Sequence, residues 1–345
     1  MLKRWVLQRW VAVALVLYSA VCMASGQLGQ LKLAVKTTDL LNGRLTVRVP
    51  SQGQSHAMAH SIMAAPDSVS ESTRLVINSG PQRMVLVAYE LFARTDQGFE
   101  QAVQRASTKL PAKGRVEEWP LPAPLRGFAC FPVAPTHNEE ANLVMGVYVA
   151  QADGTVQYVA FYINRSAAKD FNAAAILAKS IAKTIAAGQR RLNSSAGERE
   201  FSAYSAKNSI FATLPDGYVV TAQDGPDFVV HHVRKLVRFG EPAESLGLYV
   251  GDHPSSNREG FKQAGIAVLF GKQAQWYEKE STENGETDYF TSAIVPLGER
   301  SPQGEREMPS FADVFLSTGT HAGTEELKKV AATLRIGESK AKEKK

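Results

Sequence analysis

The sequence is very poor in cysteine. Two cysteines occur in 345 residues, and Cys22 lies in a segment that we expect to be removed. Cys130 alone cannot form an internal disulfide, so oxidation is not expected to hold this fold together. Its neighbours in residues 127–132 are mostly apolar. This setting favours a buried, unreactive thiol over a nucleophile, which needs a base beside it.

Motifs for catalysis and cofactor binding are absent as well. The sequence has no Gly-x-Ser-x-Gly element of the kind that presents a nucleophilic serine. Residues 265–273 have the glycines and the Gly-Lys pair of a phosphate loop but lack the Ser or Thr that follows them, so we interpret this segment as a buried strand. We therefore expect no cofactor, and we favour a protein that is not an enzyme.

One apolar stretch stands out, and it lies at the N-terminus. A basic head with Lys3, Arg4 and Arg9 precedes apolar residues 11–21, and small residues follow around Ala24. A basic head, a short apolar core and small residues are the features of a cleaved secretory signal. The core is too short to span a hydrocarbon layer of about 30 Å. We predict that residues 1–24 are a signal peptide, that the mature protein is periplasmic, and that it has no integral membrane span.

An alternative for the leader is a lipoprotein signal that ends at Cys22. Such signals usually have Leu three residues before the cysteine and Ala or Gly directly before it. Here Ser19 and Val21 occupy those positions. We therefore favour simple cleavage over lipid attachment at Cys22, which would anchor the protein to a membrane.

The charge balance gives no case for nucleic acid as a partner. The chain has 39 basic and 34 acidic residues, and the leader contributes three of the basic ones. The mature chain thus has 36 basic against 34 acidic residues, which is close to neutral. Residues 338–345 form a lysine-rich tail that we expect to be disordered.

The pattern along the mature chain predicts two similar domains. Its 321 residues, obtained as 345 less the leader of 24, are long for one core and natural for two. We assign residues 25–188 to the first domain, the polar segment 189–203 to a linker and residues 204–337 to the second domain. Each domain is predicted to be α+β, with a mainly antiparallel sheet covered by helices.

Several elements have clear local signals. Residues 83–92 are apolar on both faces, as in a strand buried on both sides. Asp153-Gly154 and Asn284-Gly285 mark the turns of hairpins. Helical spacing of apolar residues predicts a helix from Thr95 or Asp96 to about Leu110 and two further helices over residues 167–187 and 324–334. The prolines at 120, 122 and 124 interrupt the pattern between these elements.

The second half resembles a known class of domain. Phe211-Ala212-Thr213-Leu214-Pro215-Asp216-Gly217 ends a strand in a tight turn, and helix 324–334 closes the strands that follow. This order resembles PsbP-like and DcrB-like α/β sandwich domains, possibly duplicated here, although Ser51-Gln52 replace Asp-Gly in the first half. The resemblance implies a binding module or adaptor without a catalytic set. The organisation is also similar to two-domain periplasmic immunity proteins that neutralise secreted toxins.

Histidines offer candidate metal or catalytic sites. His56 and His60 would share one face of a helix, but the Ala-Met-Ala between them excludes a zinc-protease motif, and no third ligand is evident. His231 and His232 lie in a strand, so their side chains point to opposite faces. Asp252 and His253, at a strand end, are the alternative catalytic pair of an envelope hydrolase. Turn chemistry is the simpler interpretation of these two residues.

A second group of candidates lies on the hairpin around Asn284-Gly285. Glu278 and Glu280 share a face with Trp276, as carboxylates do in glycosidases, but charges that protect an edge strand explain them more simply. The binding residues that we predict are aromatic. They are Trp276, Tyr277, Tyr289 and Phe290. Large aromatic side chains suit binding surfaces, although they also fill cores.

The sequence thus predicts an exported, non-enzymatic protein that engages another protein. An immunity protein is a subclass of this hypothesis. An envelope hydrolase that uses Asp252 and His253, or His56 and His60, is the alternative.

Overall fold

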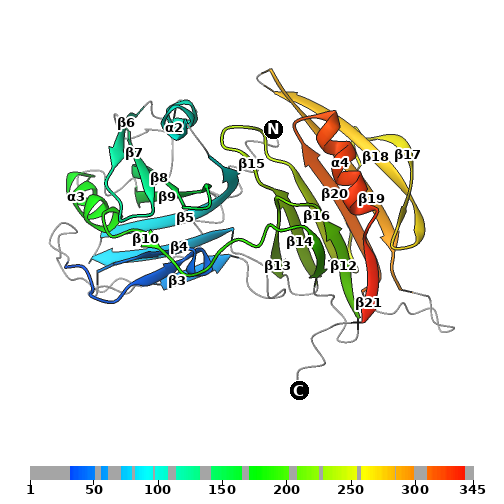
Figure 1. Cartoon of the computed structure of the whole chain (residues 1–345), viewed down its shortest axis with the longest axis horizontal. Helices are drawn as coiled ribbons and strands as arrows, with labels where there is room; N and C mark the ends of the chain where they lie inside the picture. The colour runs from blue at the N-terminus through cyan, green and yellow to red at the C-terminus, as the bar shows by residue number, and fades with distance from the viewer. Residues whose placement is uncertain are drawn as a thin grey trace.

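The structure is a computed structural model of the chain (Figure 1). It describes residues 32–50, 56–60, 71–79, 82–95, 98–107, 114–132, 141–164, 171–201, 208–224, 228–254, 258–283, 285–298 and 309–338. The predicted signal peptide and the predicted basic tail lie outside the described residues, apart from Glu338. Two large antiparallel sheets form the body of the molecule, and they lie side by side (Figure 1).

The first sheet is built around a hairpin of long apolar strands. Its antiparallel strands follow one another in the order β3 (His56–His60), β4 (Ser72–Ser79), β5 (Gln82–Arg94), β9 (Thr155–Asn164), β8 (Ala141–Ala150), β7 (Arg126–Phe131) and β6 (Arg115–Trp119). β9 is buried along nearly its whole length, because layers cover both faces of the sheet.

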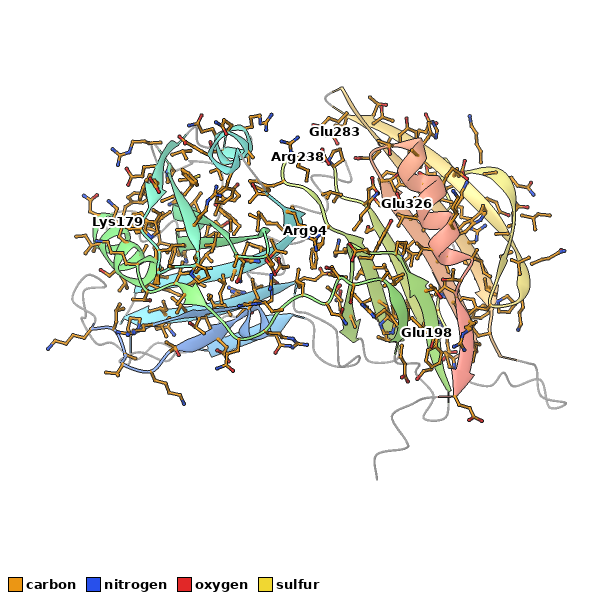
Figure 2. All side chains as sticks on the ribbon, viewed as in Figure 1. Arg94, Lys179, Glu198, Arg238, Glu283 and Glu326 are labelled. Carbon is orange, nitrogen blue, oxygen red and sulfur yellow. The ribbon has the colours of Figure 1, made fainter. Side chains whose placement is uncertain are left out.

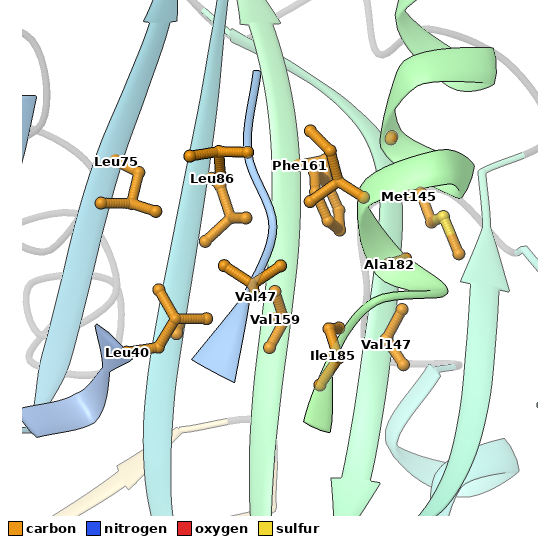
Figure 3. Close-up of a cluster of buried hydrophobic side chains, with 14 of the residues drawn as sticks. Leu40, Val47, Leu75, Leu86, Met145, Val147, Val159, Phe161, Ala182 and Ile185 are labelled. Carbon is orange, nitrogen blue, oxygen red and sulfur yellow. The ribbon is translucent and has the colours of Figure 1, made fainter. Parts of the chain in front are cut away.

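A different layer covers each face of the first sheet. On one face lie α3 (Phe171–Ala182) and a small sheet of β1 (Thr38–Leu40), β2 (Leu45–Val47) and β10 (Ala186–Ala187). Their apolar side chains interlock with those of β4, β5, β8 and β9 (Figure 3). A 3₁₀ turn, η2 (Leu41–Gly43), joins β1 to β2. On the other face, α2 (Phe99–Ser107) packs Phe99 and Val103 against Tyr148 and Tyr158.

The second sheet repeats the strand order of the first. Its strands follow one another as β13 (Tyr218–Asp224), β14 (Phe228–Lys235), β16 (Ser245–Gly251), β20 (Phe311–Thr318), β19 (Glu286–Pro296), β18 (Lys272–Glu283) and β17 (Lys262–Leu269). α4 (His321–Ala331) takes the place of α3, and its cap Thr320 accepts a hydrogen bond from Gly323 N at 3.0 Å. A small sheet of β11 (Gly197–Phe201), β12 (Asn208–Leu214) and β21 (Arg335–Glu338) completes the layer.

The connection between the third and fourth strands, in chain order, differs between the two halves. In the first half, α2 lies between β5 and β6 and covers the face opposite α3. The corresponding connection runs from β16 to β17, and its described residues, 252–254 and 258–261, contain no helix. Within the described parts of the chain, the second sheet therefore has a helix on one face only.

The predicted fold class is wrong. The described residues are mostly strand, with three α-helices among them, so the protein is not a pair of helix-covered α+β sandwiches. Small sheets provide part of each covering layer that we had assigned to helices. The predicted helix 167–187 includes Ala186–Ala187, which pair with β2 as strand β10. Part of the predicted linker is also strand, because β11 pairs with β12.

The halves contact each other through the connection between β14 and β16. The short strand β15 (Val237–Arg238) pairs in parallel with the end of β5, in the register Arg238 to Arg94 (Figure 2). Phe239 then reaches the face of the first sheet that α2 covers, where its ring lies 6.1 Å from Phe99 and 5.5 Å from Tyr148. The second half thus supplies one side chain to the core of the first.

Candidate functional site

The uncovered face of the second sheet is the main candidate for a functional surface. Directly paired residues of an antiparallel sheet point to the same side, so the register assigns each side chain to a face. The residues that share the side opposite α4 form what we call the open face. They include Val230, Tyr249, Asp313, Phe315, Ser292, Phe290, Tyr277, Ile266 and Val268, together with polar residues such as Gln275, Lys279 and Ser317.

One end of this side of the sheet is covered by the first half. Val219 in β13 packs with Phe92 of β5, and Thr221 donates a hydrogen bond to Glu71 at 2.6 Å. His232, on the same side, is held close to Glu71 and Arg234. The open face begins where this contact ends, and it extends across the sheet to the edge strand β17.

Edge strand β17 exposes two large aliphatic side chains. Ile266 is 70% exposed and Val268 is 58% exposed, and both project on the open face because they alternate with Ala267 and Leu269, which face the core. The edge strand of the first sheet, β6, instead presents charge, with an ion pair of 2.8 Å between Arg115 and Glu117. Charge on an edge discourages association, whereas exposed aliphatic side chains favour it.

A pocket of about 380 Å³ lies on the open face between β14, β16, β19, β20 and the connection before β17. Its lining consists of Val230, Tyr249, His253, Arg258, Phe261, Ser292, Asp313 and Phe315. The ring of Phe315 occupies the space in which a side chain at position 247 would lie, so Gly247 allows the ring to approach the sheet backbone.

Asp313 is the buried acid of this pocket. It is 6% exposed, and its Oδ1 accepts a hydrogen bond from Ser292 Oγ at 3.1 Å. Burial raises the pKa of Asp313 to about 6, although the Ser292 hydrogen bond and the charge of Arg258 act in the opposite direction. A carboxylate in this position costs free energy unless a cation or further donors meet it.

Aromatic rings and cations already pair on this face. The guanidinium of Arg258 lies 3.7 Å from the ring centroid of Tyr277. The ring of Tyr249 lies 5.5 Å from that of Phe228, and its hydroxyl accepts a hydrogen bond from His253 N at 3.0 Å. These contacts hold Arg258 and His253 at the rim of the pocket.

The structure separates the four aromatic residues that we predicted for binding. Tyr277 and Phe290 lie on the open face, as their pairing with Ser292 and Lys279 requires. Trp276 is 5% exposed in the core beneath α4. Tyr289 also faces α4, where its ring centroid lies 4.1 Å from that of His321, with the two rings tilted by 44°. The four therefore do not form one surface.

The two residues of the predicted catalytic pair, Asp252 and His253, also lie in different surroundings. Asp252 Oδ1 accepts a hydrogen bond from Ser310 N at 3.0 Å, which ties two connections together. His253 is exposed and lines the pocket, where it meets Ser292 and Asp313. The Ser292 hydroxyl donates directly to Asp313, so this geometry is not that of a serine with a histidine base.

The other residues that we considered from the sequence as candidates for metal binding or catalysis do not come together in a site. His56 and His60 lie in strand β3 rather than on a helix, and the described residues contain no group of three metal-binding side chains. Glu278 forms an ion pair of 2.6 Å with Lys328 of α4. His231 packs against Phe201 on the core side, opposite His232, as predicted. Burial raises the pKa of the Cys130 thiol to about 12, which makes it a poor nucleophile.

Asp313 and its surroundings were not predicted from the sequence. The one local signal is an aspartate in the apolar strand Phe311–Thr318, at a position that alternates with buried Ala312 and Val314. The partners of Asp313 come from other strands and from a connection, so no spacing in the sequence indicates them.

Comparisons with known proteins give no family. No family model matches the sequence, and no curated protein matches it, so the resemblance to PsbP-like domains is not confirmed. No described helix has the length and apolar character needed to cross a membrane.

Three solved structures share a loose likeness with the chain. The Tle4–Tli4 complex has 9% identity and a TM-score of 0.24, and the immunity protein TplEi of the type VI secretion system of Pseudomonas aeruginosa has 12% and 0.23 without a ligand. TplEi in complex with "L" peptide has 10% and 0.25. Each match covers 87% of this chain and 96% of the other. At these TM-scores, the likeness supports no conclusion about function.

Proposed function

We propose that this chain is a non-enzymatic protein that binds another protein through the open face of its second sheet. One observation supports this most directly. The second sheet repeats the strand order of the first but lacks, in the described residues, a helix that corresponds to α2. Aromatic and aliphatic side chains that such a layer would cover are left on the surface, which is typical of an interaction site.

The chemistry of the face favours binding over catalysis. Its rings and aliphatic side chains provide area that a partner can bury, and Tyr277 and Phe290 lose little rotamer freedom when they do so. Within the pocket, the hydroxyl of Ser292 is bonded to Asp313, and the guanidinium of Arg258 lies against the ring of Tyr277. The Ser292 hydroxyl is bonded to the Asp313 carboxylate and to no histidine among the described residues, so the hydrolase that we considered, with His253 as its base, has no support there.

Within protein binding, we propose an immunity protein that neutralises a secreted toxin. The two-part organisation and the predicted export to the periplasm support this subclass. The solved structures with a loose likeness to the chain include immunity proteins of a type VI secretion system, but the proposal rests on the features of this chain. We also propose that residues 1–24 are cleaved on export and that residues 25–188 and 204–337 are two domains, the second of which also includes strand β11.

The test compares two exposed aliphatic sites. If a gene beside this one encodes a secreted toxin, the affinity of the purified toxin is measured for the wild type, for the double variant Ile266→Asp/Val268→Asp and for Ile176→Asp. Ile176 is 59% exposed on α3, far from the open face, so it is a matched control. We expect the double variant to bind at least tenfold more weakly and the control to bind like the wild type.

Two outcomes would contradict the proposal. A neighbouring toxin that does not bind the wild type removes the immunity subclass. Equal affinities for all three proteins remove the open face as the binding surface. Photo-crosslinking in living cells from a benzoylphenylalanine at position 266, with position 176 as the control, tests binding even when the partner is unidentified. We expect a discrete crosslinked protein from position 266 alone.

A further inference from the structure

We infer that the pocket around Asp313 receives a cationic side chain, lysine or arginine, from the bound partner. This inference rests on the proposed function and adds the chemistry that the partner must present. It combines the pocket, the buried carboxylate and the rings that surround it.

The carboxylate of Asp313 has unused capacity for hydrogen bonds. An ionised carboxylate can accept about four hydrogen bonds, and Ser292 Oγ supplies one at 3.1 Å. Among the described residues, no cationic group forms an ion pair with Asp313 within 4.0 Å. The charge of Arg258 acts on Asp313 from a greater distance. A partner cation that reached Asp313 would form charge-assisted hydrogen bonds with a carboxylate that is itself only 6% exposed.

Three of the remaining walls are rings suited to a cation, whereas Arg258 is itself a cation and lies at the rim against Tyr277. The rings of Tyr249, Phe261 and Phe315 line the pocket, and ring faces attract ammonium and guanidinium groups. Arg258, 3.7 Å from the centroid of Tyr277, shows that a ring of this face already holds a guanidinium. The pocket volume of about 380 Å³ is near the lower limit for ligand sites, which suits one side chain rather than a large cofactor.

In the first sheet, the protein's own side chains fill the corresponding side of the fold. There, Phe99 of α2 and Phe239 of the second half pack against Tyr148. Arg126 places its guanidinium 5.5 Å from the ring centroid of Phe99. The protein thus fills the face of the first sheet with its own rings and cation, whereas the second sheet offers rings and a carboxylate to another molecule.

The experiment uses small probes and the full mature protein. N-acetylarginine amide is titrated into labelled protein and followed by NMR at the amides of Ser292, Asp313 and Phe315. N-acetylcitrulline amide, which has a similar shape without the charge, is the matched neutral probe. We expect saturable shifts with the arginine probe and binding at least tenfold weaker with the citrulline probe.

Asp313→Asn keeps the side-chain shape and removes the charge, and we expect it to weaken binding of the arginine probe at least tenfold. Asp39→Asn, on β1 in the first half, is the control and is expected to bind like the wild type. Equal shifts with both probes, no saturable shift in the wild type, or full binding by Asp313→Asn would each overturn the inference.

The outcomes for the two proposals are separable. A partner that binds the wild type and Asp313→Asn equally well, but binds Ile266→Asp/Val268→Asp at least tenfold more weakly, supports the open face and rejects the cationic side chain. In the converse outcome, the wild type binds the arginine probe while the Ile266→Asp/Val268→Asp variant keeps full affinity for the partner. That result would reject only the open face as the binding surface.

Discussion

Glu71 Oε1 accepts two hydrogen bonds from Arg234, from Nη2 at 2.7 Å and from Nε at 3.0 Å. The two residues come from different halves, since Glu71 directly precedes β4 and Arg234 lies in β14. The guanidinium of Arg234 also lies 5.0 Å from the ring centroid of Phe92. Burial opposes ionisation of Glu71, but Arg234, His232 and Thr221 outweigh it, so the pKa of Glu71 is lowered. This contact fixes the first half against the covered end of the second sheet.

Glu71→Gln is therefore expected to destabilise the protein by about 2 kcal/mol, because it leaves a partly buried guanidinium without its charge partner. Urea unfolding at pH 7 measures the change. Glu198→Gln is the control, since Glu198 pairs at 2.6 Å with the exposed Arg335 inside the second half. An exposed pair contributes about 1 kcal/mol or less. Equal losses in the two variants would show that the contact between the halves has no special role.

The stability of this contact is expected to fall at acidic pH. Burial, followed by Arg234, lowers the pKa of His232 to about 4, from an ordinary value of 6.5. As the pH falls from 6.5 to 4, the unfolded chain takes up a proton that the folded protein does not, so stability present above pH 6.5 is lost across this window. The shift corresponds to a loss of up to about 3 kcal/mol.

His232→Gln removes this dependence, because glutamine does not titrate. The free energy of unfolding is compared at pH 7 and pH 4.5 for the wild type, for His232→Gln and for His321→Gln, whose side chain is 73% exposed in the wild type. We expect a smaller loss at pH 4.5 for His232→Gln than for the other two proteins. Parallel losses in all three would rule out His232 as the cause.

The first half depends on a buried ion pair that its sequence does not reveal. Arg44 Nε lies 3.1 Å from Glu90 Oε2, and both side chains are fully buried. Arg44 also donates to Thr155 Oγ1 at 2.6 Å, and Gln157 Nε2 donates to Glu90 Oε1 at 3.1 Å. These bonds join the turn before β2 to the central strands β5 and β9.

Glu90→Gln is expected to cost about 3 kcal/mol, since it leaves the buried charge of Arg44 with only the partly exposed carboxylate of Asp153, 3.7 Å away. Glu117→Gln removes the partner of Arg115 on the exposed edge strand β6 and is expected to change stability by less than about 1 kcal/mol. Thermal and urea unfolding of both variants test this difference. A small effect at Glu90 would mean that the pair is replaceable in this site.

Local patterns predicted the hairpins well and the layers poorly. The hairpins β8–β9 and β18–β19 form around Gly154 and Gly285, both of which have positive φ, as the Asp-Gly and Asn-Gly signals require. The proline-rich break fell in the connection between β6 and β7, so both strands were missed. Strands of two or three residues, such as Ala186–Ala187, have no periodicity that a sequence pattern can detect.

The sequence predicted only part of the candidate site. It shows how side chains alternate along one strand, but it does not show which strands pair. Neighbours in a strand point to opposite faces, so Trp276 and Tyr277 had to separate, and this was available from the sequence. That Tyr277 pairs with Ser292, and Ser292 with Phe315, depends on strand order and register. Apart from Phe315, the residues that surround Asp313 are about 20 to 80 positions away in the sequence, and no local rule connects them with it.

The buried acid of the open face leads to a prediction opposite in sign to that for His232. The pKa of Asp313 is raised to about 6 from an ordinary value of 3.8. As the pH rises from 3.8 to 6, the unfolded chain loses its proton before the folded protein does, so this group progressively destabilises the fold and the full penalty is present above pH 6. Asp313→Asn removes the penalty, and the variant should be more stable than the wild type at pH 7 by up to about 3 kcal/mol. Urea unfolding at pH 7 and pH 4 measures this gain in stability, which is expected to be smaller at pH 4.

A variant that is more stable yet binds its partner more weakly would show that the protein retains Asp313 for binding at the expense of stability. A variant less stable than the wild type at pH 7 would show instead that the carboxylate is compensated within the folded protein.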